Sequence, residues 1–270
     1  MLAKSYPFTL ALLRIFAAFI FWQHGAQKVF GMFGGDAAAT FTLVWVAGLA
    51  EFFGSILLAV GFLTRPVSLV LAVDMAILYL GTYLPQGFPP VVDRNGEAAA
   101  ILFAIAALFV FTGPERFSVD SVLKGRSGGV EQSSIADHLN RHHSMALGAF
   151  RILIGLLYLE HGMQKMFGMF GANAQEFGVL LWYAGVIEFL GGVAITLGLF
   201  TRAVTFVTSG QMAFAFFLNH FPRAFFPIEN AGERAVLFSF TFLFLVSAGA
   251  GLWSLDGLLK RRTGPIKETK

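Results

Sequence analysis

Ionisable residues inside apolar stretches are the first candidates for chemistry in this sequence. His24 and Lys28 lie four residues apart near the end of one such stretch, and Arg14 lies nearer its start. Residues four apart share a helix face, so these cations would form one polar stripe. An ionised side chain in hydrocarbon costs at least about 2.5 kcal/mol unless it is paired or hydrated, which makes such positions candidates for a functional site. Histidine titrates near neutral pH, so His24 suits proton transfer, and an interfacial hydrogen bond is the alternative.

Glu51 lies within the next apolar stretch. At a rise of 1.5 Å per residue, Arg14 would lie about 9 Å below one membrane surface and Glu51 about 15 Å below the other. In a hydrocarbon core of about 30 Å these levels are close, so we predict an ion pair between Arg14 and Glu51. Such a pair either holds two helices in register or belongs to a site that binds a polar head group or carries protons.

Glu97 stands at the start of a later apolar stretch, where a helix N-terminus would favour its charge. We expect it to meet Lys28 or His24. One histidine and one carboxylate are too few for a good metal site, so no metal is predicted. A haem held by two imidazoles would need His24 and His161 to meet, which the spacing does not demand. The absence of cysteine excludes thiolate ligation and iron–sulfur clusters held by this chain.

The candidate residues recur when the chain is compared with itself at an offset of 137 residues, or 136 for the last of them. The candidate ligand-binding or cofactor-binding residues are therefore Arg14, His24, Lys28, Glu51, Glu97, Arg151, His161, Lys165, Glu188 and Glu233. The repeat predicts a second ion pair, between Arg151 and Glu188.

Two polar positions break the repeat. Asp74 in the first half corresponds to Gln211 in the second, and Gln23 corresponds to Glu160. A role shared by both halves is therefore not expected for Asp74. The halves can share a scaffold and differ in activity.

Transmembrane helices are the elements that would carry these residues. Hydrophobic residues make up 56% of the 270 and charged residues only 13%, whereas soluble domains are about a quarter charged. A membrane span needs roughly 20 apolar residues, and such windows cover residues 8–30, 41–63, 66–84, 97–113, 145–167, 177–200, 203–221 and 234–252. We predict an all-α integral membrane protein of eight transmembrane helices, arranged as two tandem four-helix bundles. The first window is not a cleaved signal peptide, because its counterpart is internal.

The repeat and a polar stretch between its copies predict the domain boundaries. Residues 1–125 and 145–270 would form the two four-helix units, joined by a cytoplasmic linker over residues 126–144. Lys and Arg concentrate on the side of the termini and the linker, which predicts that both termini are cytoplasmic. Four spans per unit would give both units the same orientation, a parallel repeat. The Ser-Val-Asp and Ser-Leu-Asp segments at 118–120 and 254–256 predict short capped helices at that surface.

The recurring motifs resemble those of the DoxX family of small four-helix membrane proteins. They are Arg14, His24-Gly25, Lys28, Glu51-Phe52-Phe53-Gly54, Gly61-Phe62-Leu63-Thr64-Arg65, Asn95-Gly96-Glu97 and Ser118-Val119-Asp120. The second half repeats them with few departures, such as Ala231 before Gly232-Glu233, so the chain resembles a tandem DoxX protein. The family takes its name from a subunit of a thiosulfate:quinone oxidoreductase. The resemblance implies a quinone-linked or redox-associated membrane component, and it assigns no catalytic residue.

The leading hypothesis is a plasma (inner) membrane protein that binds a quinone or a similar lipophilic molecule between its helices. The predicted Arg–Glu pair and His24 would supply polar contacts, and a redox partner subunit or an external donor would supply electrons. A small-solute or proton-coupled carrier is one alternative, and a structural subunit without its own activity is another. Membrane lipids are expected partners. Nucleic acid is not, despite a pI near 9.3, because no basic stripe is interleaved with aromatic residues.

Overall fold

Helices make up the regular structure throughout the described residues. The computed structural model describes residues 2–90, 96–126 and 134–263. The main helices are α1 (Tyr6–Phe30), α2 (Leu43–Val60), α3 (Thr64–Leu78), α4 (Gly96–Thr112), α7 (His143–Phe167), α8 (Leu180–Leu197), α9 (Thr201–Ala215) and α11 (Glu233–Ala248). Each coincides with one of the predicted apolar windows, which confirms the all-α class and the helix positions.

Several of these helices can cross a membrane by length and composition alone. Within the described residues five qualify, at Tyr6–Phe30, Leu43–Val60, Thr64–Gln86, His143–Phe167 and Leu180–Leu197. The span at Thr64–Gln86 consists of α3, a π-helical segment (Tyr79–Tyr83) and a 3-10 turn (Leu84–Gln86). In the second half, a π-helical segment (Phe216–His220) continues α9 in the same way. The chain is therefore a membrane protein by the physical criteria of span length and hydropathy.

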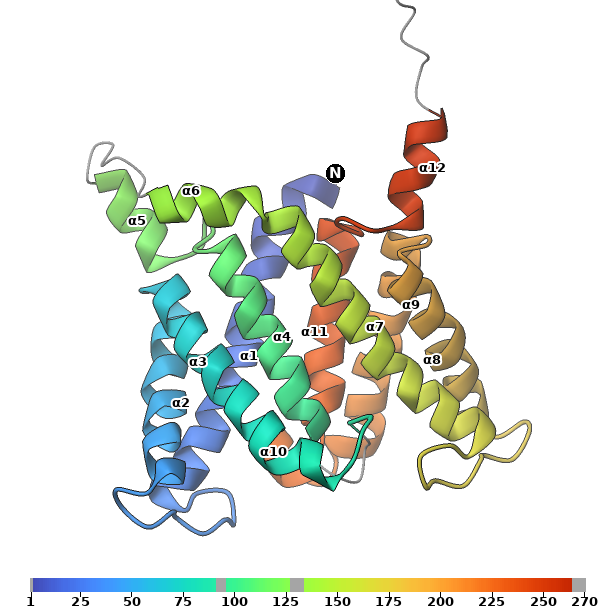
Figure 1. Cartoon of the computed structure of the whole chain (residues 1–270). Coiled ribbons are helices and arrows are strands. Elements are labelled where there is room, and N and C mark those ends of the chain that lie inside the picture. The colour runs from blue at the N-terminus through green and yellow to red at the C-terminus, as the bar shows by residue number, and fades with distance from the viewer. Residues whose placement is uncertain (1, 91–95, 127–133, 264–270) are drawn as a thin grey trace, which may run out of the picture.

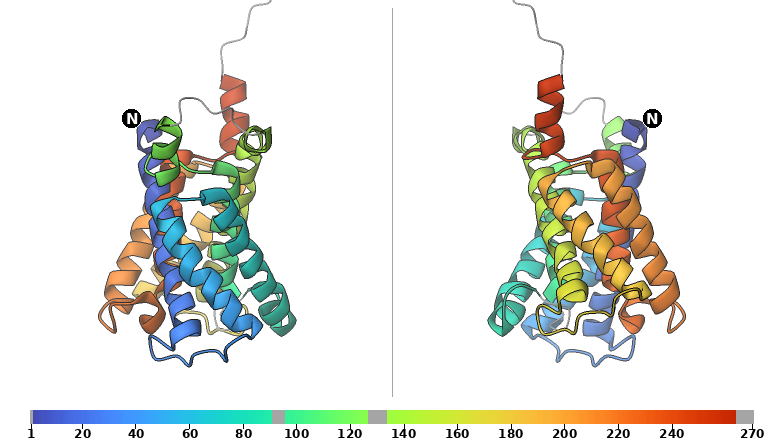
Figure 2. Two further views of the ribbon diagram at one scale, coloured as in Figure 1. Left: turned by 90° about the vertical axis from the view of Figure 1, so that its left-hand side faces the viewer. Right: turned by 90° about the vertical axis from the view of Figure 1, so that its right-hand side faces the viewer.

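The bundle has two distinct ends. α1 and α7 both begin at one end, called here the terminal end because the N-terminal 3-10 turn (Leu2–Ser5) lies there. The shorter helices α5 (Val119–Arg126), α6 (Ser134–Arg141) and α12 (Leu255–Thr263) also lie at this end (Figure 1, Figure 2). The loops that join α1 to α2 and α7 to α8, together with α10 (Pro227–Asn230), lie at the opposite, distal end.

The two halves interlock, in contrast to the predicted pair of tandem bundles. α1 packs along α2 and also along α11 of the other half, and α7 packs along α8 and also along α4. In the first of these contacts the rings of Phe16 and Phe240 stack with centroids 3.6 Å apart, and the hydroxyls of Thr9 and Ser247 lie 2.5 Å apart. The first helix of each half needs two neighbours, because 56% of the α1 window is buried and only 22% of the α2 window.

The predicted linker contains a helix that docks on the first half. Arg65, at the start of α3, donates hydrogen bonds to the side chain of Asn140 at 2.5 Å and to the carbonyl of Ala136 at 3.2 Å, both on α6. Residues 127–133 of the linker lie outside the described residues, as does Asn95.

Short helices follow the fourth helix of each half, as the sequence predicts. The Ser118 hydroxyl caps α5 from its N-terminal side. The neighbouring Asp120 caps a different helix, because its carboxylate accepts from the backbone N–H groups of Leu63 and Thr64 at 2.9 Å each, where α3 begins. Asp256 does the same for α9. Each aspartate therefore joins the short helix that carries it to the start of the third helix of its half, at the terminal end.

Candidate functional site

The predicted pairing of Arg14 with Glu51 is wrong. Arg14 donates instead to the backbone carbonyl of Phe117 and lies beside Gly61, at the end of α2. Gly61 follows Glu51 by ten residues, which is about 15 Å along a helix. The two side chains are therefore at different levels, because the crossing of α1 and α2 sets their register and a depth measured from each membrane surface does not.

Arg151 is held in the same way, so its predicted pairing with Glu188 is wrong too. Its buried guanidinium donates to the carbonyls of Ile195 at 2.7 Å, Ala250 at 2.7 Å and Trp253 at 2.8 Å. These carbonyls lie at the end of α8 and after the end of α11. Arg14 and Arg151 therefore join helix ends near the terminal end and take no part in the polar site below.

The lysines of the first helices are the cations that pair with the buried glutamates. Lys28 Nζ lies 2.5 Å from Glu51 Oε1, and Lys165 Nζ lies 2.5 Å from Glu188 Oε1. The glutamate side chains are 0% and 2% exposed. In each of them the second carboxylate oxygen is buried and makes no hydrogen bond within the described residues.

A glycine in each first helix brings these pairs together. A Cβ atom added at Gly25 would lie 2.4 Å from the backbone nitrogen of Phe52, and one added at Gly162 would lie 2.3 Å from that of Phe189. Small residues allow membrane helices to approach this closely. Each glycine precedes the lysine by three residues, and each phenylalanine directly follows the glutamate. The close helix crossing therefore places the lysine against the glutamate.

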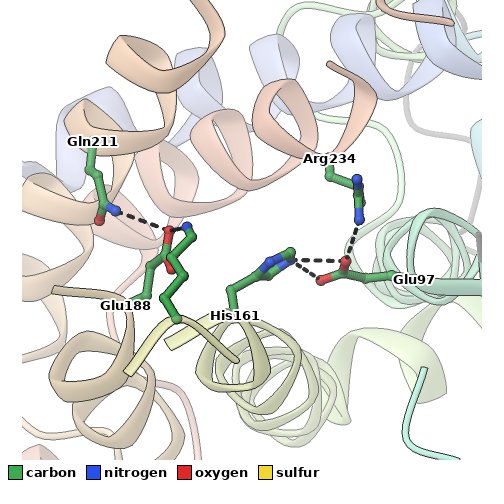
Figure 3. Close-up of polar contacts among 6 residues, drawn as sticks. Glu97, His161, Glu188, Gln211 and Arg234 are labelled. Atoms are coloured by element: carbon green, nitrogen blue, oxygen red, sulfur yellow. Dashed lines mark hydrogen bonds and ion pairs between the residues drawn. The ribbon is translucent and has the colours of Figure 1, made fainter. Parts of the chain in front are cut away.

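His24 and His161 each pair with a glutamate of the other half. His161 Nε2 lies 2.7 and 2.9 Å from the carboxylate oxygens of Glu97, and Arg234 Nη1 lies 3.5 Å from the same carboxylate (Figure 3). His24 Nε2 lies 2.8 Å from Glu233. The expectation that Glu97 meets the cations of its own half is wrong, because α4 packs on α7 of the other half.

A cavity opens beside these pairs in each half. The first cavity, of about 430 Å³, is lined by Lys28 and Glu51 and by Glu233 and Arg234 from the second half. The second cavity, of about 750 Å³, is lined by Lys165, Glu188, His161, Gln211, Arg223 and Arg234, among others. Arg234 lies in the wall of both.

The second cavity has a buried polar base and exposed apolar side chains along part of its opening. Its polar base holds the buried Glu188. The exposed lining is apolar at Leu180, Val207, Phe214 and Leu218 and polar at Asn219 and Arg223. In a bilayer such exposed apolar side chains contact lipid. The apolar part of the opening would therefore face the acyl chains, and the cavity ends at charged groups.

The break in the repeat at Asp74 and Gln211 falls inside this polar site. Gln211 Nε2 donates to Glu188 at 3.1 Å (Figure 3), and the Tyr158 hydroxyl donates to Gln211 Oε1 at 2.5 Å. In the first half these two positions are Asp74 and Phe21. The carboxyl of Asp74 lies within interaction range of the first-half lysine and glutamate. The two halves thus surround equivalent glutamates with different chemistry.

Three contributors were not predicted from the sequence. Arg234, Gln211 and Tyr158 all mark differences between the halves, since their counterparts are Ala98, Asp74 and Phe21. The break in the repeat at Gln211 is visible in the sequence, and the differences at Arg234 and Tyr158 give the same kind of signal.

The arrangement supplies N–H donors held in place by carboxylates. In the described part of the chain no three His, Asp or Glu side chains gather as a metal site would require. Lysine, histidine and arginine at the base of a cavity can donate to a carbonyl, hydroxyl or anionic oxygen. The chemistry fits an oxygen-bearing head group attached to an apolar body.

Comparison with known proteins agrees with this architecture. The DoxX family model matches the chain twice, at residues 9–83 and 146–221. An uncharacterized protein of Haemophilus influenzae is 38% identical over 127 residues, which cover 44% of this chain and 95% of the relative. The inner membrane protein YqjF of Escherichia coli is 30% identical over 119 residues, with coverages of 42% and 90%. An uncharacterized membrane protein of Mycobacterium tuberculosis, Rv3486, is 30% identical over 132 residues, with coverages of 42% and 80%.

No solved structure matches the chain. Each of these relatives aligns with less than half of this chain but with most of its own length, so a relative corresponds to one repeat. The family model matches more than half of the chain and recurs at the spacing of the repeat. The chain is a membrane protein of the DoxX family, in which the family unit occurs twice.

Proposed function

We propose that this protein binds a lipophilic molecule of the quinone class in the second cavity. The observation that carries the proposal is the gradient of polarity along this cavity, from the exposed Phe214 and Leu218 at its mouth to the buried Glu188 at its base. A quinone has the matching shape, with an apolar tail and a ring that bears two carbonyl oxygens. It would enter sideways from the bilayer, tail outwards.

The base of the cavity supplies the donors that carbonyl oxygens need. Lys165, His161 and Arg234 line it and are each held by a carboxylate, Glu188 for the lysine and Glu97 for the other two. Ion pairing fixes the orientation of these donors before a ligand arrives, which lowers the entropic cost of binding. Electrons would come from a partner subunit or an external donor, so the protein would serve as a membrane component of a redox assembly.

Filling the second cavity should weaken ligand binding. Gly210 lines the cavity, and a Cβ atom added there meets no atom within 4 Å. Gly210→Phe should therefore place a ring in the cavity without straining the helix packing. We expect binding of a short-chain benzoquinone, measured by isothermal titration calorimetry in a mild detergent, to weaken at least about tenfold, or about 1.4 kcal/mol.

The matched control is Val73→Phe, at the equivalent exposed position of the first half. This variant should bind like the unmodified protein. Absence of quinone binding by the unmodified protein, or equal binding by Gly210→Phe, would show that the cavity has another occupant.

The membrane topology is part of the same proposal. We propose eight membrane spans, with both halves the same way up and both termini in the cytoplasm. The direction of α1 and α7 in the bundle supports this arrangement (Figure 1), as does the concentration of Lys and Arg at the terminal end. The units at residues 1–125 and 145–270 would then be related by an axis along the membrane normal.

Single cysteines can test this topology, because the chain has none of its own. Asp36 and Asn173 are exposed equivalents in the two distal loops, and Lys4 is exposed at the terminal end. Asp36→Cys and Asn173→Cys should both react with an impermeant maleimide added to intact cells, and Lys4→Cys should react only after lysis. Labelling of one distal cysteine but not the other would mean that the halves are inverted.

A further inference from the structure

The first half buries two acidic groups, Glu51 and Asp74, beside a single described cation that contacts them, Lys28. Glu51 uses one carboxylate oxygen for Lys28, and its other oxygen, Oε2, is buried without a hydrogen-bond partner among the residues that the structure describes. Oδ2 of Asp74, on the adjacent α3, is also buried and also lacks a hydrogen-bond partner among the described residues. Asp74 occupies the position at which Gln211 of the second half contacts Glu188 at 3.1 Å, and its carboxyl lies within interaction range of Glu51. Each therefore has an oxygen that lacks a donor, and each is next to an acid.

The surrounding charges do not supply the missing donor. On α1, Lys28 already contacts Glu51, and His24 lies against Glu233 of α11. Arg234 of α11 lines the same cavity and reaches Glu97 of α4.

The π-helical turn after α3 adds only the neutral hydroxyl of Tyr83 to the cavity wall. With both acids ionised, the trio of Glu51, Asp74 and Lys28 would carry one net negative charge in a low-dielectric bundle. Two carboxylates in contact disfavour simultaneous ionisation. An unsatisfied buried acceptor costs about 1–3 kcal/mol in addition.

In the second half, neutral side chains surround the equivalent glutamate, Glu188. There the acid is replaced by Gln211, whose amide donates to Glu188 at 3.1 Å. The amide is oriented by the Tyr158 hydroxyl, which occupies the position of Phe21. Tyrosine and glutamine therefore occur together in one half, and phenylalanine and aspartate in the other. Only the first half needs a proton to supply the donor that the amide provides in the second.

We propose that Glu51 and Asp74 form a proton-binding site, in which the two carboxyl groups share one proton beside Lys28. The shared proton gives the acceptor oxygens a donor and brings the trio to zero net charge. The proton comes from water and returns to it through the first cavity, which is large enough for several water molecules and is lined by polar groups. Binding changes the charge of the carboxyl pair from −2 to −1. The site differs from the proposed ligand cavity and does not depend on it.

Infrared spectroscopy of the full chain in lipid vesicles tests this proposal directly. A buried protonated carboxyl group gives a carbonyl stretch that shifts in D₂O. At pH 7 the unmodified protein should show such a band, and Asp74→Asn should lose it. Glu51→Gln should lose the same band, because the remaining acid then pairs with Lys28 as a carboxylate. Asp74→Asn is expected to fold, since an amide is native at the equivalent position.

The matched control is Glu160→Gln, which changes an acid that directly precedes His161 and whose first-half counterpart is the native Gln23. The band assigned to the pair should persist in this variant. A band that survives both Asp74→Asn and Glu51→Gln would overturn the proposal, as would a spectrum of the unmodified protein without any contribution that Asp74→Asn removes. The latter result would mean that both acids are ionised and that a cation such as Na⁺ balances them. Neither result bears on quinone binding in the second cavity.

Discussion

Lys28→Met should destabilise the protein by about 3–5 kcal/mol, the cost of leaving one member of a buried ion pair without its partner. Lys28 is the cation against Glu51, a fully buried carboxylate that also faces Asp74. Removing the ammonium leaves the negative charge of the acid pair without the counter-charge of Lys28. Unfolding monitored by circular dichroism during titration with SDS measures the loss.

The second half provides a graded control for this result. Lys165→Met should cost at least about 1 kcal/mol less than Lys28→Met, because Gln211 still donates a hydrogen bond to Glu188. The double variant Lys165→Met with Glu188→Leu should recover most of the lost stability, since it leaves no buried charge. If both single lysine variants unfold like the unmodified protein, the ion pairs do not stabilise the fold.

Cutting the linker should leave the two halves bound to each other. A protease site placed within residues 127–133 allows the full chain to be purified in mild detergent and then cleaved. Because α1 packs on α11 and α4 on α7, we expect the cleaved protein to elute as one species in size-exclusion chromatography. Separate bundles joined only by a linker would come apart.

Charge reversal at Glu97 should break this association. Glu97 is 1% exposed and faces His161 and Arg234 of the other half. In Glu97→Lys the new ammonium meets those groups in a buried interface, and like charges brought together there cost several kcal/mol. The cleaved variant should therefore separate, with association weakened at least about a hundredfold. The control Glu176→Lys, at an exposed loop position, should stay associated after cleavage.

The sequence predicts the elements of this fold well. Every main helix coincides with an apolar window, because the helix length and hydropathy that a bilayer requires are properties of a single segment. The short helices after residues 118 and 254 are also confirmed, since a capping serine acts within its own turn. Such features depend on residues that are neighbours in the sequence.

Pairing of charges was predicted poorly, for a physical reason. The sequence identifies His24, Lys28, Glu51 and Glu97 as polar residues in apolar surroundings, and the structure brings all four into or beside one polar region. Which cation meets which acid depends on how two helices cross. The close contact between Gly25 and Phe52 sets how α1 and α2 cross. The depth of a residue below the membrane surface says nothing about this contact.

By itself the sequence determined a membrane protein of the DoxX family, its repeat, the positions of its helices and the set of charges that they bury. Only the tertiary structure decided that Arg14 binds a carbonyl, that Lys28 and Lys165 pair with the buried glutamates, and that His24 and His161 each meet an acid from the other half. Hydropathy and repetition are local properties of the chain, whereas the partner of a buried charge depends on which helices pack together. Here α1 packs on α11 and α4 packs on α7, so helices of one half contact helices of the other. The acid that pairs with His24 or with His161 therefore comes from the other half.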